Sequence, residues 1–478
     1  MPSTRTKIVA TAGPACESPA LVRQMIDAGA DVFRLNFSHG DHASHARSIR
    51  TVRTVAAEAG VPVAVMQDLQ GPRIRTGTLR DHKPVELAAG AAVALRAGDF
   101  MGDADTLSVS YEALAADVEP GESILLADGL IELTVLETDG TTVRCRVDVG
   151  GELGEHKGIN LPGASLSITA PTPKDLEDLR FGLEQEVDYV ALSFVRSAAD
   201  VLRLKEEMLR IGGPGARTPV IAKIEKPEAV ENLAEILRAS DGVMVARGDL
   251  GIEMPAESVP TVQKRIIHMA NHFGLPVITA TQMLESMMHA RRPTRAEASD
   301  VANAMLDGTD AVMLSGETAV GAYPVEAVRM MARISHKIDE VWRSEPGSVA
   351  PTIREVDNPQ QHALAEAACG IADKLDAAGI VAFTMTGSTA RYIAQRRPDA
   401  PVYALTPDES TYRRLALVWG VQAVMLGVFE TTDEMVQQGQ KRLLDLGLAA
   451  PGDVVVYMAG ASTRTSGGTD MLKIHRFA

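Results

Sequence analysis

The chain has 478 residues, of which 45% are hydrophobic and 23% charged, as in a globular protein of two or three domains. Its formal net charge of −16 argues against a partner such as nucleic acid or an anionic membrane surface. The three cysteines lie far apart, and no apolar stretch approaches membrane-spanning length, so we expect a cytoplasmic enzyme without a disulfide framework or a structural zinc site.

The first predicted elements are short apolar runs that alternate with amphipathic segments such as 20–28 and 200–209. Runs that are apolar on both faces are typical of parallel strands covered by helices. Eight of them in strand–helix order predict a closed (β/α)8 TIM barrel. The predicted strands are 7–12, 32–36, 63–67, 189–193, 220–224, 242–245, 277–279 and 311–314.

One long segment interrupts this alternation. Residues 72–168 show alternating polarity, glycine-rich turns and β-branched runs, without a long helical pattern. We expect a small all-β, barrel-like domain inserted after the third barrel strand, so that the barrel comprises 1–71 and 169–340. An insertion at that point lies over the mouth of the barrel and can act as a lid.

A third domain is predicted over 341–478. Turn-forming residues at 345–348 indicate a linker, after which strands and helices alternate again. This pattern predicts an open α/β sheet. Its predicted elements are a helix over 361–375 and strands over 379–384, 402–405, 421–426 and 454–458.

Polar residues gather where the predicted barrel strands end. The carboxyl ends of barrel strands meet at one rim, where polar side chains are costly unless they are paired or functional. We therefore interpret the set as one candidate site. Its members are Arg34, Asn36, Ser38, His39, Asp68, Lys223, Glu225, Arg247, Gly248, Asp249, Thr281, Gln282, Ser315 and Glu317.

The composition of this set indicates phosphate chemistry. The carboxylates of Glu225 and Asp249 are suited to a hard divalent cation. Arg34 and Lys223 can neutralise a phosphoryl group during transfer, and the backbone amides that follow Arg247 can receive a substrate carboxylate. The chain has neither a P-loop motif nor the protein-kinase motifs.

Long motifs in the same residues resemble the pyruvate kinase family over nearly the whole chain. The resemblance implies phosphoryl transfer from phosphoenolpyruvate to ADP, giving pyruvate and ATP, by a homotetramer that uses Mg²⁺ or Mn²⁺. The motifs are TKIVATAGPA (6–15), RLNFSHG (34–40), DLQGPRIRTG (68–77), KGINLPG (157–163), AKIEKPEAV (222–230), DGVMVARGDLGIE (241–253), ATQMLESM (280–287) and the run 292–324.

The resemblance also implies individual roles. Glu225 and Asp249 would bind the metal, and Lys223 would stabilise the phosphoryl group in flight. Thr281, near Ser315 and Glu317, would lie where the enolate is protonated, with a water relay as the proton source because a threonine hydroxyl is a weak acid. The implied catalytic residues are Lys223, Thr281 and Arg34; the substrate-binding residues are Arg34, Gly248, Asp249 and Thr281; and the nucleotide-binding residues are Asn36, His39, Arg75 and Lys157.

The chain departs from many family members at Arg73, where those that need K⁺ tend to carry glutamate. A cation at this position goes with members that do not require K⁺, so we expect activity without K⁺. Alternatively, Arg73 simply points to solvent. The family's K⁺ pocket would correspond to Asn36, Ser38, Asp68 and the carbonyl of Leu69.

A hydroxyl-rich turn in the C-terminal domain resembles the family's effector phosphate loop. It follows a predicted strand and opens a helix, where exposed amides can bind an anion such as a sugar phosphate or AMP. An N-capped helix without a ligand is an equal alternative. The loop residues are Thr384, Thr386, Gly387, Ser388 and Thr389.

Two other functions remain open at this stage. The first is a non-catalytic homologue that senses phosphorylated metabolites, which would have no need of a proton-delivery residue such as Thr281. The second is a metal-dependent aldolase or lyase that acts on a pyruvate enolate. Arg75, Lys157 and the inserted domain disfavour the second, because such an enzyme binds no nucleotide.

Overall fold

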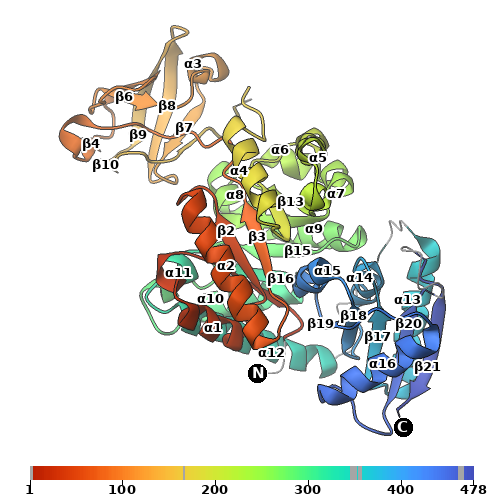
Figure 1. Cartoon of the computed structure of the whole chain (residues 1–478). Helices are drawn as coiled ribbons and strands as arrows, with labels where there is room; N and C mark the ends of the chain where they lie inside the picture. Colours follow the sequence, from red (N-terminus) through yellow and green to blue (C-terminus); the bar gives the residue numbers. More distant parts are fainter. Residues whose placement is uncertain (1–3, 165–166, 345–352, 354–357, 461–467, 478) are drawn as a thin grey trace.

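The computed structural model describes residues 4–164, 167–344, 353, 358–460 and 468–477. Three parts follow one another in space: an inserted β domain, a central barrel and a C-terminal α/β domain (Figure 1). The linker predicted at 345–348 lies outside the described residues. The domain limits derived from the sequence stay a prediction.

Eight parallel strands close the central barrel in the order β1-β16-β15-β14-β13-β12-β3-β2. All eight predicted strands are confirmed, and each boundary agrees within one residue. Their two-sided apolar pattern arises because one face packs inside the barrel and the other beneath the helices. The strands are β1 (Lys7–Thr11), β2 (Val32–Asn36), β3 (Ala64–Asp68), β12 (Tyr189–Leu192), β13 (Val220–Ile224), β14 (Gly242–Ala246), β15 (Val277–Ala280) and β16 (Ala311–Leu314).

Helices surround the barrel and begin and end at recognisable signals. In α1, Ser18 caps the first turn by accepting a hydrogen bond from the Leu21 amide, and Gly29 ends the helix with a left-handed φ of 115°. The helices of this part are α1 (Pro19–Ala28), α2 (His42–Ala59), α4 (Pro173–Glu184), α5 (Ala198–Ile211), α6 (Pro227–Glu231), α7 (Leu233–Ala239), α8 (Arg247–Glu253), α9 (Val259–His272), α10 (Arg295–Leu306), α11 (Gly316–Ala319) and α12 (Pro324–Ser344).

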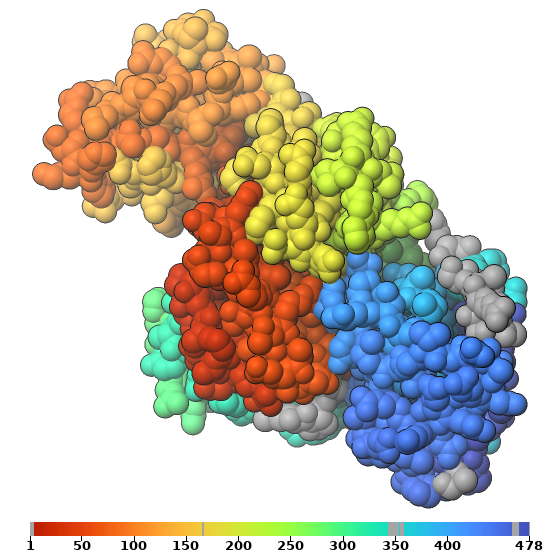
Figure 2. All heavy atoms as spheres, viewed as in Figure 1, coloured from red at the N-terminus to blue at the C-terminus, as the bar shows by residue number. Residues whose placement is uncertain are grey.

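The inserted domain projects from the carboxyl end of the barrel, as Figure 2 shows. It has an apolar core of its own and a single one-turn helix, α3 (Leu114–Asp117), among its described residues. Six of its strands form one sheet in the order β11-β7-β8-β9-β5-β6, and β10 pairs with β4. The strands are β4 (Val85–Leu87), β5 (Ala92–Ala97), β6 (Thr106–Val109), β7 (Ser123–Leu126), β8 (Ile131–Thr138), β9 (Thr142–Val149), β10 (Gly151–Leu153) and β11 (Ile159–Asn160).

The C-terminal domain is an open sheet in the order β19-β18-β17-β20-β21. Its four parallel strands were expected, but the antiparallel edge strand β21 (Met471–Arg476) was not. The other elements are α13 (Pro359–Leu375), β17 (Gly379–Phe383), α14 (Ser388–Ala394), β18 (Val402–Thr406), α15 (Glu409–Arg414), the 3-10 turn η6 (Leu415–Leu417), β19 (Val421–Met425), α16 (Thr432–Asp445) and β20 (Val454–Ala459).

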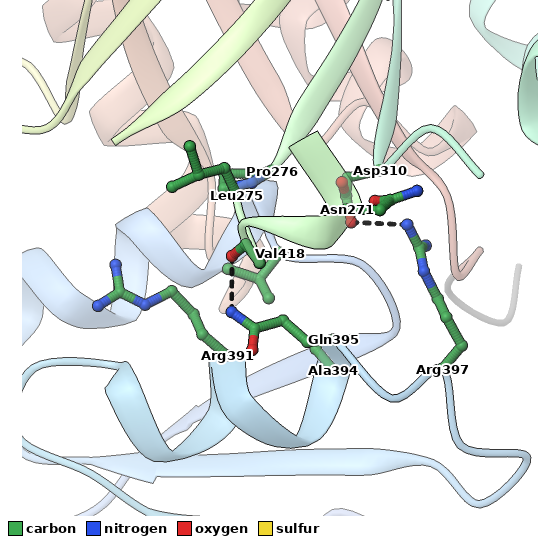
Figure 3. Close-up of a pocket in the computed structure, with 10 residues that line it drawn as sticks. Asn271, Leu275, Pro276, Asp310, Arg391, Ala394, Gln395, Arg397 and Val418 are labelled. Carbon is green, nitrogen blue, oxygen red and sulfur yellow. Dashed lines mark hydrogen bonds and ion pairs between the residues drawn. The ribbon is translucent and has the colours of Figure 1, made fainter. Parts of the chain in front are cut away.

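The C-terminal domain packs against the amino ends of the barrel strands. Gln395 donates to the carbonyl of Gly274 at 2.6 Å, and Arg397 pairs with Asp310 at 2.9 Å (Figure 3). A cavity of about 30 Å³ lies between these contacts, which is room for roughly one water molecule. The inserted domain and the C-terminal domain therefore occupy opposite ends of the barrel.

Among the described residues, no helix is both long and apolar enough to cross a membrane.

Candidate active site

Lys223 is the centre of the polar cluster at the carboxyl end of the barrel. Its ammonium lies 2.8 Å from Glu225 and 3.2 Å from Asp68, and it donates to the hydroxyl of Ser193 at 2.8 Å. Each of its three N–H groups therefore has an acceptor. These contacts bring together the ends of β13, β3 and β12, and the Lys223 side chain is only 8% exposed.

Arg34, in the middle of β2, completes the cationic side of this cluster. Its guanidinium pairs with Asp68 at 2.6 Å and donates to the hydroxyl of Thr11 at 3.1 Å. Asp68 thus lies between two cations, Arg34 and Lys223. Three of the predicted rim residues meet at this one carboxylate.

The ionisation of the cluster follows from burial and charge. Burial opposes the charged forms of Lys223 and Asp68, but the opposite charges around them outweigh it. The pKa of Lys223 is consequently raised, and the pKa of Asp68 is lowered, so both groups stay charged at neutral pH.

Glu225 has a different environment. Burial raises its pKa, the charge of Asp249 raises it further, and Lys223 opposes both effects. Its second oxygen accepts a hydrogen bond from the amide of Phe194 at 2.7 Å. An additional cation would relieve the repulsion between these two carboxylates, which have a single ammonium beside them.

The donor set fits a hard divalent cation. Mg²⁺ is commonly held by one or two carboxylates, with water and substrate oxygens completing its octahedron. Glu225 and Asp249 could supply those carboxylates. Among the described residues, no group of three or more histidine, cysteine, aspartate or glutamate side chains is placed to hold a metal ion.

Thr281 and Gly248 meet where β15 and β14 end. The Thr281 hydroxyl accepts a hydrogen bond from the Gly248 amide at 2.7 Å and donates to the carbonyl of Ala280 at 2.6 Å. Thr281 and Gln282 adopt left-handed φ values of 67° and 53°. For a β-branched threonine this conformation is strained, and such strain is concentrated at functional sites.

Arg247 holds this strained turn in place. Its guanidinium donates to the carbonyls of Thr281 at 2.7 Å and Gln282 at 3.2 Å and pairs with Asp300 at 2.6 Å. The sequence placed Arg247 at a strand end without a role. The residues that follow it form the short helix α8, whose first turn contains Gly248 and Asp249.

A second group of cations lies at the base of the inserted domain. Partial burial lowers the pKa of His39, and nearby positive charges lower it further. These charges belong to Arg73, Arg75 and Arg34. Arg75 bridges to Gly158, so the backbones of Arg75 and Lys157 lie on neighbouring chain segments although they are far apart in sequence.

In the predicted monovalent-cation pocket, the oxygens of Asn36, Asp68 and Leu69 already have hydrogen-bond partners. The Asn36 side chain accepts from the Ser38 amide at 3.1 Å, and the Leu69 carbonyl accepts from Ser193 at 2.7 Å. Both oxygens of Asp68 have cationic partners. Arg73 is exposed, and its charge acts on His39 and Arg75.

Comparison with known families decides the identity of the chain. A family model described as "Pyruvate kinase, barrel domain" matches residues 3–328, and another described as "Pyruvate kinase, alpha/beta domain" matches residues 362–475. The chain belongs to the pyruvate kinase family.

Similar proteins are aligned over nearly the whole chain. "Pyruvate kinase 2" of Synechocystis sp. is 48% identical over 474 residues, which are 98% of this chain and 79% of that protein. "Pyruvate kinase" of Mycobacterium tuberculosis (strain H37Rv) is 46% identical over 472 residues, with 99% and 98% covered. "Pyruvate kinase" of Clostridium acetobutylicum is 45% identical over 471 residues, with 98% and 99% covered.

Two residues of this pyruvate kinase site were not predicted. Ser193 links Lys223 to the Leu69 carbonyl, and Thr11 binds Arg34. Both stand at the ends of predicted barrel strands, the first and the fourth, from which no rim residue was chosen. The rule that selected the other rim residues would have found them.

Ser315 directly follows β16, and Glu317 lies in the short helix α11. The carboxylate of Glu317 accepts hydrogen bonds from the amides of Leu284 at 3.0 Å and Ser315 at 2.7 Å. Glu317 therefore fixes the loop that follows Thr281. Its carboxylate contacts backbone amides in this arrangement, which is a positioning role.

The predicted effector loop lies in the C-terminal domain, away from this rim. Gly387 has a left-handed φ of 83°, and its amide donates to the Thr384 hydroxyl at 2.9 Å. The hydroxyls of Thr386 and Ser388 lie 3.2 Å apart, and the hydroxyls of Thr389 and Thr469 are hydrogen-bonded at 2.8 Å. The loop is thus a compact hydroxyl cluster at the start of α14.

Proposed function

We propose that this chain catalyses phosphoryl transfer from phosphoenolpyruvate to ADP, giving pyruvate and ATP. The observation that carries the proposal is the Lys223 ammonium, held among Glu225, Asp68 and Ser193 at the mouth of a barrel of the pyruvate kinase family. A fixed, buried cation is what a migrating phosphoryl group needs, because the chemistry depends on alignment and charge neutralisation.

Different residues would bind the phosphate, the carboxylate and the metal. Arg34 and Lys223 would bind the phosphate oxygens of phosphoenolpyruvate, and an incoming oxygen would replace one of the present acceptors of Lys223. Gly248, Asp249 and Thr281 would border the substrate carboxylate. A divalent cation bound by Glu225 and Asp249, with Mg²⁺ or Mn²⁺ as the candidates, would supply additional positive charge for the transferring group.

Nucleotide binding falls to the base of the inserted domain. Arg75 and Lys157, together with Asn36 and His39, would hold the phosphates of ADP. The lowered pKa of His39 supports this assignment, because three surrounding arginine charges contribute to it beside partial burial. A closed inserted domain would also keep water from the phosphoryl group.

Proton delivery to the enolate is best assigned to water positioned by Thr281. The Thr281 hydroxyl donates its own proton to the Ala280 carbonyl at 2.6 Å, so that proton is committed to the backbone. The hydroxyl oxygen still accepts from Gly248. This geometry supports a water relay over direct proton transfer from the threonine.

The decisive test is pyruvate formation from phosphoenolpyruvate, measured with and without ADP in the presence of Mg²⁺. We expect pyruvate only when ADP is present, with one ATP formed per pyruvate. A metabolite sensor would form none, and a lyase would form product independently of ADP. Either result would remove the proposed function.

We further propose activity without K⁺. In the predicted K⁺ pocket, Arg34 and Lys223 already pair with Asp68, and Ser193 donates to the Leu69 carbonyl. Arg73 adds positive charge near His39. The rate in Na⁺ or tetramethylammonium buffer should be close to the rate in K⁺, and Arg73→Glu should introduce a K⁺ requirement. Collapse of the unmodified enzyme without K⁺ would contradict the proposal.

The remaining assignments concern regulation, assembly and location. We propose a homotetramer in the cytoplasm, activated by a sugar phosphate or AMP at the loop that opens α14. The hydroxyls of Thr384, Thr386, Ser388 and Thr389 support an anion there. A screen of phosphorylated metabolites against the basal rate would identify the activator, and sedimentation would give the assembly.

A further inference from the structure

A buried ion pair lies directly behind the proposed metal ligands. Lys226 donates to Glu253 at 2.6 Å, and Asn160 donates to the same carboxylate oxygen at 2.9 Å. The side chains of Lys226 and Glu253 are 9% and 2% exposed. No step of the mechanism above uses any of these three residues.

The pair joins the same two chain segments that carry the metal ligands. Lys226 directly follows Glu225 at the end of β13. Glu253 is the last residue of α8, four positions after Asp249, so both carboxylates lie on one face of that helix. A contact between Lys226 and Glu253 therefore constrains the separation between Glu225 and Asp249.

Phe194 strengthens this constraint from a third strand end. Its ring lies 5.7 Å beneath the Lys226 ammonium, and its backbone amide donates to Glu225 at 2.7 Å. The Lys226 ammonium is buried between the Glu253 carboxylate and the Phe194 ring, so it has little freedom to move. The arrangement is rigid where the metal ligands need a fixed spacing.

Asn160 brings the inserted domain into the same cluster. It is the last residue of β11, close to the point where the chain returns from the inserted domain to the barrel. Its hydrogen bond to Glu253 is a side-chain contact between the two domains, 93 residues apart in sequence. The position of the inserted domain is thus tied to the helix that carries Asp249.

We propose that Glu253 is a positioning residue: it binds Lys226 and Asn160 together and so sets the geometry of the Glu225–Asp249 metal site and its link to the inserted domain. The inference rests on the proposed function, because it assumes that Glu225 and Asp249 hold the metal. Residues that orient metal ligands from behind typically change metal affinity by about 10- to 100-fold when removed.

The test separates metal geometry from folding. Lys226→Met alone leaves a buried, uncompensated Glu253 and should lower the Tm by about 5 °C or more. Lys226→Met/Glu253→Leu removes both charges and should restore the Tm to near that of the parent. Mn²⁺ binding, measured by electron paramagnetic resonance without substrate, should still be about tenfold weaker in the double variant.

A matched control uses another buried ion pair. Arg397 and Asp310 lie at the amino ends of the strands, with side chains 7% and 14% exposed. Arg397→Met/Asp310→Leu should leave Mn²⁺ affinity unchanged. If the Lys226/Glu253 double variant binds Mn²⁺ as tightly as the parent, the positioning role is wrong. If the unmodified enzyme neither binds Mn²⁺ nor forms pyruvate, the proposed function itself fails.

The link to the inserted domain has a separate readout. Asn160→Ala keeps the Lys226–Glu253 pair and removes only the contact between domains. We expect the KM for ADP to rise several-fold while the KM for phosphoenolpyruvate and the Mn²⁺ affinity stay within twofold, because the inserted domain carries the proposed nucleotide residues. An unchanged KM for ADP would remove Asn160 from the proposal.

Discussion

In both the barrel and the C-terminal sheet, polar loops follow the carboxyl ends of parallel strands. The two sets of strand ends, here called the barrel rim and the C-terminal rim, nevertheless carry different groups. At the barrel rim, Lys223 and Asp68 are buried charges paired across strands. At the C-terminal rim, the Thr384 hydroxyl accepts from the Gly387 amide, and the Thr386 hydroxyl bonds the Ser388 hydroxyl. One rim is an ionic network, and the other is a neutral loop at a helix start.

The difference follows from closure of the sheet. A closed barrel surrounds its rim, so that a charge on one strand can find partners on several others and remain compensated when buried. An open sheet offers partners on fewer sides, and its loops stay nearer to solvent. Buried charge chemistry is therefore expected at the closed rim, and reversible binding of a solvated anion at the open one.

The largest effect should come from removing the central cation. Lys223→Met leaves Asp68 and Glu225 without their shared ammonium and removes the charge proposed to stabilise the phosphoryl group. We expect kcat to fall by about 10³-fold in the coupled pyruvate assay. Lys83→Met, which removes an exposed lysine of the inserted domain, should retain full activity. If kcat falls less than tenfold in Lys223→Met, the charge of Lys223 is not central to the reaction.

Metal removal should have the next largest effect. The family uses a divalent metal, and we propose that Glu225 and Asp249 hold it. Chelation with EDTA should lower the rate by about 10²-fold or more, and added Mg²⁺ or Mn²⁺ should restore it. Full activity in excess chelator would show that Lys223 and Arg34 suffice for charge neutralisation.

A smaller, regulatory effect is expected at the neutral rim. Thr386→Glu puts a negative charge where an activating anion would bind, so the activator response should disappear while the basal rate stays the same. Gln437→Glu adds the same charge on an exposed position of α16 and should preserve the response. If Thr386→Glu responds normally, the loop has no effector role.

The smallest effect concerns the three thiols, one in each part of the molecule. Burial raises the pKa of Cys16, Cys145 and Cys369, to about 12 for the latter two. Since the thiolate is the reactive form, the native enzyme should resist iodoacetamide at pH 8 and take up three labels only when unfolded. Labelling of one cysteine in the native state would identify the part that opens most readily.

Much of the site could be predicted because strand ends are visible in sequence. Apolar runs located all eight barrel strands, and the polar residues within or just after these runs include Lys223, Arg34 and Asp68. Ser193 and Thr11 were missed because the first and fourth strand ends were not searched. The bonding role of Arg247 could not be predicted, since its partners are carbonyls of the Thr281 turn, which have no sequence signature.

The C-terminal domain shows a second limit of sequence patterns. Its parallel strands and its first helix were predicted, whereas β21 was missed. The residues of β21 are only partly buried or exposed, so they lack the two-sided apolar pattern that marks a central strand. Pairing with β20 creates this strand, and pairing is a property of the folded sheet.

By itself, the sequence determined the order of the domains, the strands of the barrel and the kind of chemistry at its rim, because apolar periodicity and residue type are local. Only the tertiary structure decided which groups meet. Asp68 and Lys223 are 155 positions apart, and Asn160 and Glu253 belong to different domains. Such partners are chosen by closure of the barrel and docking of the inserted domain, which no local pattern encodes.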